Sequence, residues 1–123
     1  MTACALPVSQ CHDASNGDFL NLIVRCYDTF IEDLQDAKHA HAEGRYDLFM
    51  DRLRHAQDIL TELLIGLDYE RGGEIAVNLG RIYNYMLREL IAVHDTQAQG
   101  TLGRMISMAG DLREAWVQIT AVV

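Results

Sequence analysis

The apolar residues of this chain recur at alternating steps of three and four, a spacing that places them along one face of an α-helix. The most regular seam lies in residues 46–67, where charged side chains fill the opposite face; it comprises Tyr46, Phe49, Leu53, Ala56, Leu60, Leu63 and Leu67. A similar seam lies in residues 19–42 and comprises Leu20, Ile23, Tyr27, Phe30, Leu34, Ala37 and His41. Seams of this kind pack against antiparallel neighbours in a helical bundle.

Two more segments have helical spacing. In residues 74–96 the stripe is Ile75, Leu79, Ile82, Met86, Leu90 and Val93, and we expect it to hold the bundle together. In residues 101–121 the face is Leu102, Met105, Ile106, Ala109, Leu112, Trp116 and Ile119. Gly103 and Gly110 weaken this last helix, and close helix packing would be one reason to keep them.

The ends of these segments carry helix-boundary residues. Asp18 and Thr101 are candidate N-caps, Gly44 is a C-terminal stop, and residues 68–73 form a turn that contains Gly72 and Gly73. Residues 1–17 have no period and are rich in loop formers. We therefore predict an all-α protein in two parts: a flexible N-terminal tail of residues 1–17, and an elongated antiparallel four-helix bundle of residues 18–123.

The charge balance restricts the class of partner. Eighteen acidic residues against ten basic ones give a net charge of −8. Binding to phosphates needs clustered Lys and Arg, so nucleic acid and an anionic membrane surface are poor partners. No apolar run has the length of a signal peptide or a membrane span, and three cysteines make no disulfide framework. These features predict a cytoplasmic protein without membrane insertion.

The sequence offers little catalytic chemistry. No Glu-x-x-His motif for a di-iron bundle site occurs, and no glycine-rich loop follows a strand. Cys4, Cys11 and His12 have the spacing of no familiar zinc site, and Cys26 reads as a small buried hydrophobe. We predict a protein that is not an enzyme and that has no metal or cofactor.

Several residues beside the stripe of residues 74–96 have two interpretations. Tyr27, Tyr83 and Tyr85 either belong to the core, with their hydroxyl groups at its rim, or line a groove for an amphipathic helix. Asn78 is a poor helix former in mid-helix, and if buried its amide needs a partner. That partner is either a neighbouring backbone or an incoming chain.

Four separated motifs resemble those of the flagellar secretion chaperones for flagellin, the FliS family. The first is Gly72-Gly73-Glu74-Ile75-Ala76-Val77-Asn78-Leu79 with Ile82-Tyr83-Asn84-Tyr85-Met86. The others are Cys26-Tyr27-Asp28, residues 55–63 with Leu67-Asp68, and Leu112-Arg113-Glu114-Ala115-Trp116. The resemblance covers about residues 18–118, in the family's order and spacing.

The resemblance implies a cytoplasmic export chaperone. Such proteins bind the disordered C-terminal segment of flagellin, prevent premature polymerisation and assist delivery to the flagellar type III export gate. The client-binding residues would then be Ile23, Tyr27, Ala76, Asn78, Leu79, Tyr83, Tyr85 and Met86. The alternative is a homodimeric helical scaffold or adaptor without an export client, in which the apolar surplus of the first and third helices forms the subunit interface.

Overall fold

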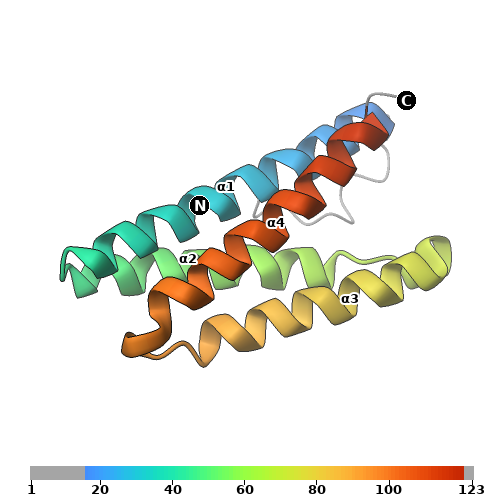
Figure 1. Cartoon of the computed structure of the whole chain (residues 1–123). Coiled ribbons are helices and arrows are strands. Elements are labelled where there is room, and N and C mark those ends of the chain that lie inside the picture. Colours follow the sequence, from blue (N-terminus) through green and yellow to red (C-terminus); the bar gives the residue numbers. More distant parts are fainter. Residues whose placement is uncertain (1–15, 121–123) are drawn as a thin grey trace.

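A computed structural model describes residues 16–120, and every regular element in this part of the chain is a helix. The helices are α1 (Asn16–Ala42), α2 (Tyr46–Ile65), α3 (Tyr69–Ile91) and α4 (Ala98–Thr120), with a short 3₁₀ helix, η3 (Asp95–Gln97), ahead of α4 (Figure 1). The predicted all-α class is confirmed. The predicted tail lies outside the described residues except for Asn16 and Gly17, which begin α1, and Cys4, Cys11 and His12 lie outside them too.

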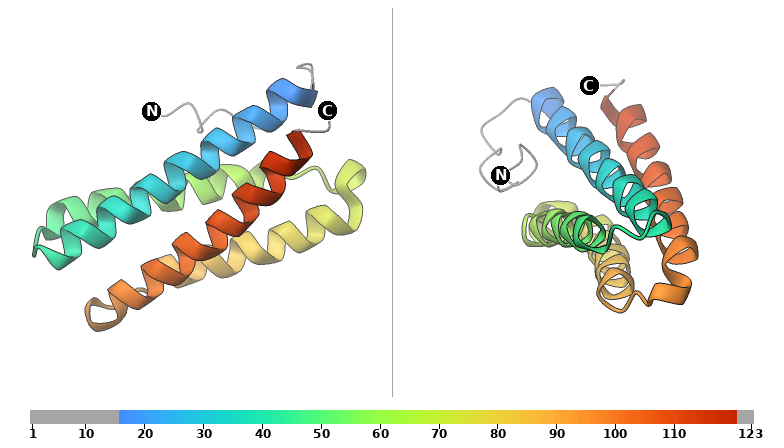
Figure 2. Two further views of the ribbon diagram at one scale, coloured as in Figure 1. Left: turned by 45° about the horizontal axis from the view of Figure 1, so that its top comes forward. Right: turned by 90° about the vertical axis from the view of Figure 1, so that its left-hand side faces the viewer.

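The helices form a bundle in which α1 has the most extensive packing. It lies along both α2 and α4, while α3 packs chiefly on α2 and touches α4 only sparsely (Figures 1 and 2). Short connections make successive helices antiparallel, as expected. Because α3 is held mainly from one side, part of its inner surface is left for something other than a helix of the bundle.

The boundary of α1 illustrates one correct and one wrong prediction. Gly44 has φ 73°, a left-handed conformation that glycine adopts without strain, and Arg45 N–H donates to the Ala40 carbonyl at 2.8 Å. The predicted stop at Gly44 is therefore confirmed. The caps assigned to Asp18 and Thr101 are wrong, because α1 begins at Asn16 and Thr101 is buried inside α4.

The predicted turn at residues 68–73 is mostly helical. The Asp68 carboxylate accepts hydrogen bonds from the backbone N–H groups of Glu70 and Arg71, each at 3.1 Å, and so caps a helix that starts at Tyr69. Gly73 then interrupts the helix with φ 52° and ψ −126°. The glycine pair thus bends α3 after its first turn, where the sequence predicted a plain loop.

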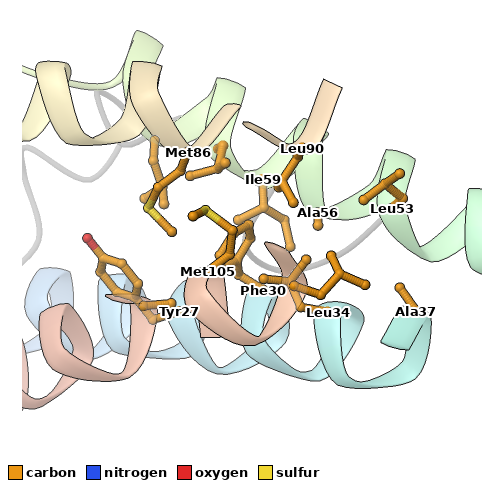
Figure 3. Close-up of a cluster of buried hydrophobic side chains, with 14 of the residues drawn as sticks. Tyr27, Phe30, Leu34, Ala37, Leu53, Ala56, Ile59, Met86, Leu90 and Met105 are labelled. Carbon is orange, nitrogen blue, oxygen red and sulfur yellow. The ribbon is translucent and has the colours of Figure 1, made fainter. Parts of the chain in front are cut away.

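The core confirms most of the predicted seams. Figure 3 shows Phe30 and Leu34 of α1 facing Ile59 of α2, Leu90 of α3 and Met105 of α4. All five side chains are buried, as is Cys26, in agreement with its reading as a small hydrophobe.

The inner face of α3 differs from the predicted stripe. Ile75 is 70% exposed, whereas the buried positions are Ala76, Gly80, Tyr83, Met86 and Leu90. The interior here is partly filled from the α2–α3 connection, because a β-carbon at Gly80 would lie only 3.0 Å from the Tyr69 hydroxyl and 3.5 Å from Leu67 Cδ1. Small residues therefore face inward at this point, and a search for large apolar residues picks the wrong side.

The glycines of α4 are not explained by close packing. A β-carbon at Gly103 or Gly110 would have no atom within 4 Å. The packing reason considered from the sequence is therefore wrong for both positions.

A polar cluster joins α1 to α2 inside the bundle. The buried Asp33 carboxylate is hydrogen-bonded to His55 Nδ1 and lies 3.6 Å from the Arg52 guanidinium. Burial raises the pKa of Asp33, and the hydrogen bond and charge of His55, with the charge of Arg52, oppose that rise. The cluster satisfies a carboxylate that would otherwise be costly to bury.

Candidate functional site

An apolar groove lies at the end of the bundle where α1 begins and α4 ends. Its volume is about 250 Å³, and the helix ends that form it lie together at the right-hand end of Figure 1. The lining residues come from all four helices and from the α2–α3 connection: Phe19, Ile23, Leu63, Gly66, Leu67, Asp68, Arg71, Gly72, Ile75, Ala76, Leu79, Tyr83 and Trp116. This is the surface that the sparse contact between α3 and α4 leaves uncovered.

The start of α3 shapes one wall of the groove. The bend at Gly73 precedes Ile75, which lines the groove although most of its surface faces solvent. Asp68 and Arg71 form the polar rim, with Arg71 Nε 3.7 Å from Asp68 Oδ2. A groove with an apolar lining and a narrow charged rim suits an apolar side chain of a peptide better than a polar small molecule.

A hydrogen-bonded triad of aromatic residues ties three helices together at the groove. The hydroxyl oxygens of Tyr27 (α1) and Tyr83 (α3) are 2.5 Å apart, and the Trp116 (α4) indole N–H donates to the Tyr27 oxygen at 3.2 Å. Tyr83 and Trp116 line the groove, while Tyr27 does not. Any ligand in the groove would therefore rest on side chains that also set the spacing of α1, α3 and α4.

Both tyrosines of this triad stay neutral at physiological pH. Burial is the first cause that raises the pKa of Tyr27, and its hydrogen bonds to Tyr83 and Trp116 partly oppose the rise. Burial also strongly raises the pKa of Tyr83, and the neighbouring Tyr27 raises it further. The hydroxyl pair is therefore a structural contact and not an acid–base centre.

The structure brings half of the predicted binding residues to the groove. Those that line it are Ile23, Ala76, Leu79 and Tyr83. Tyr27 and Met86 are buried and do not line it, whereas Asn78 and Tyr85 are exposed on the solvent side of α3. Since Asn78 is exposed, its amide needs no protein partner.

Sequence reasoning missed several groove residues because it placed them elsewhere. Ile75, Leu67 and Trp116 were assigned to core seams, although each lies close to one end of its helix. The missed signal was antiparallel geometry. In an up-and-down bundle the start of α1, the end of α2, the start of α3 and the end of α4 meet at the same end.

The described residues offer no alternative site with obvious chemistry. Within residues 16–120, no three His, Cys, Asp or Glu side chains are grouped so that they could hold a metal ion. No helix in that range has both the length and the apolar composition needed to cross a membrane.

Comparison with known proteins identifies the family. The model of the family "Flagellar protein FliS" matches residues 9–123. The chain is 32% identical over 89 residues to the flagellar secretion chaperone FliS of Vibrio cholerae, an alignment that covers 72% of this chain and 65% of that protein. It is 38% identical over 58 residues to the Salmonella typhimurium chaperone of the same name, covering 47% of this chain and 43% of the relative.

A Bacillus subtilis relative of the same name is 32% identical over 68 residues, covering 55% of this chain and 50% of its own length. The chain thus spans 43% to 65% of the length of these three relatives. The relatives are named as chaperones and not as enzymes, which agrees with the prediction that the chain is not an enzyme. The match of the family model over nearly the whole chain means that this protein belongs to the FliS family of flagellar proteins.

Proposed function

We propose that this protein is a cytoplasmic export chaperone that binds the disordered C-terminal segment of flagellin. It would prevent flagellin from polymerising early and assist its delivery to the flagellar type III export gate. The observation that carries the proposal is an apolar groove of about 250 Å³ on a member of the FliS family, whose relatives are named flagellar secretion chaperones.

The groove gives the proposal a physical mechanism. A disordered client loses chain entropy when it becomes ordered, so it must bury apolar side chains to bind. Ile23, Ala76, Leu79 and Tyr83 offer an apolar lining for such anchors. No covalent step or nucleotide is needed, because the client gains other contacts once it enters the filament.

The other predicted binding residues have different roles in this proposal. Tyr27 and Met86 lie beneath the surface, so they would act by supporting the groove. Asn78 and Tyr85 face solvent on the far side of α3, so they contact the client only if it also passes over that side.

The single tryptophan provides a direct assay. Trp116 lines the groove, so adding a synthetic C-terminal segment of flagellin, from the organism that encodes this chain, should change its fluorescence. Size-exclusion chromatography of the same mixture separates the proposal from the homodimeric scaffold. The chaperone predicts a complex with the segment, whereas the scaffold predicts a dimer alone. No complex at micromolar concentrations refutes the chaperone.

A matched pair of variants localises the binding. Ile75 and Ile65 are 70% and 71% exposed, but only Ile75 lines the groove. Ile75→Asp should weaken binding of the flagellin segment about tenfold or more, since it places a charge where an apolar side chain docks. Ile65→Asp should leave binding unchanged. Equal effects of the two variants would show that the groove is not the binding site.

A further inference from the structure

The solvent-facing side of α3 carries a surface that the groove does not use. We define the α3 outer stripe as Val77, Arg81, Tyr85, Arg88 and Ile91. These side chains follow one another along the helix at steps of three and four, and all are exposed. The groove-lining residues of α3, such as Ala76 and Tyr83, point to the opposite side, into the bundle.

The stripe is apolar to an unusual degree for a solvent-facing helix side. Val77, Tyr85 and Ile91 are 40%, 39% and 65% exposed. Scattered apolar residues on a surface need no explanation, but here they alternate with charge along four turns. From Val77 to Ile91 the stripe is about 21 Å long at 1.5 Å per residue.

The charges of the stripe are positive and unneutralised. The ion pairs within residues 16–120 involve neither Arg81 nor Arg88. The two arginines are seven residues apart, so they lie on the same helix side about 10 Å from each other along the axis. The nearby acid Glu89 is already paired with Arg104 at 2.8 Å. A local positive strip therefore stands on a protein whose net charge is −8.

We propose that the α3 outer stripe is a second docking surface, for an acidic amphipathic helix of another protein. Such a helix would lie along α3, place apolar residues on Val77, Tyr85 and Ile91, and present carboxylates seven residues apart to Arg81 and Arg88. Arginine forms two parallel hydrogen bonds with a carboxylate, which fixes the register of the partner.

A second copy of this chain is a poorer occupant. Two molecules that each carry a charge of −8 repel one another. Two stripes face to face would bring four arginines together. A stripe against an acidic face of another copy would make a contact that does not close and so would continue into a filament.

The test uses two fluorescein-labelled helical peptides of 18 residues with the same leucine seam. One peptide carries Glu at two positions seven residues apart, and the other carries Lys there. Fluorescence anisotropy against the full-length chain at low salt should show binding of the Glu peptide at least tenfold tighter than that of the Lys peptide. Because exposed charges are screened by salt, this preference should shrink in 300 mM NaCl. Equal binding of the two peptides refutes the proposal.

Charge reversal assigns the surface. Arg81→Glu/Arg88→Glu should invert the peptide preference, an outcome that loss of folding cannot produce. The control Arg25→Glu/Arg54→Glu changes net charge by the same amount at exposed arginines of α1 and α2, and should keep the preference for the Glu peptide. A preference that survives in the first variant, or vanishes equally in the control, overturns the assignment.

A competition experiment separates this surface from the proposed client groove. The Glu peptide should bind within twofold as tightly when the flagellin segment is present in excess. Competition would make the stripe part of the client's path and refute a second partner. If the flagellin segment does not bind at all, the proposed function fails, while the peptide and charge-reversal results still decide the fate of the stripe. Self-association that disappears in the α3 double variant would instead assign the stripe to a contact between copies and refute the proposal.

Discussion

The hydroxyl pair of Tyr27 and Tyr83 should contribute to stability as a unit. The side chains are on residues only 1% and 2% exposed, so neither hydroxyl can turn to water if its partner is removed. Tyr83→Phe deletes one hydrogen bond and leaves the Tyr27 hydroxyl without an acceptor for its proton. The expected loss in free energy of unfolding is about 1–2 kcal/mol, the usual cost of one buried, unsatisfied polar group.

The double variant Tyr27→Phe/Tyr83→Phe is the informative measurement. It removes both buried hydroxyl groups, and the partly exposed Trp116 indole can donate to water instead. The double variant should therefore cost no more than the worse single variant, which gives a coupling energy of about 1 kcal/mol.

Urea denaturation followed by far-ultraviolet circular dichroism is the assay. With an m-value of about 2 kcal/mol per molar urea, Tyr83→Phe should lower the midpoint by roughly 0.5–1 M. Tyr85→Phe is the control, because Tyr85 is exposed, and its midpoint should not move. If the two single effects add to within about 0.5 kcal/mol in the double variant, the hydroxyl pair is not coupled and the reasoning is wrong.

Further predictions concern pH and the helix termini. Because burial raises the pKa of Tyr27 and Tyr83, their contribution to stability should be complete below about pH 10, where unfolded tyrosine begins to ionise, and should fall at higher pH; stability measured from pH 8 to 11 should fall less steeply in the double Phe variant. Gly73→Ala should destabilise the protein by about 1–3 kcal/mol in urea titrations, because φ 52° with ψ −126° strains any residue with a β-carbon, whereas an unchanged midpoint would contradict the bend. Asp68→Ala should cost about 1 kcal/mol in the same titrations through loss of the α3 cap, and Asp68→Asn should restore most of it. Gly103→Ala should raise the melting temperature, by the equivalent of about 1 kcal/mol, since a methyl group there meets no other atom; a lower value would show hidden crowding.

The sequence alone determined the class and much of the core. Alternating steps of three and four are a local property of the chain, and they predicted α1 and α2 together with buried residues such as Phe30, Leu34 and Leu60. The motif resemblance also identified the family, because it depends only on residue identity and spacing. The assignment of Ile23, Ala76, Leu79 and Tyr83 to a groove agrees with where the structure places them, although client binding at these residues stays a prediction.

The tertiary structure decided which side of α3 faces inward and where the groove lies. Periodicity gives the angle between side chains on one helix but not the rotation of that helix in the bundle. That rotation depends on Gly80, where the absence of a side chain admits Tyr69 and Leu67, and so Ala76 faces inward while Ile75 faces out. The groove needs the start of α1, the bend at Gly73 and the end of α4 to converge, and these are separated by many residues along the chain. Local pattern predicts each helix because its hydrogen bonds are local, but an opening between helices is set by how unequally they pack, and only the assembled bundle determines that.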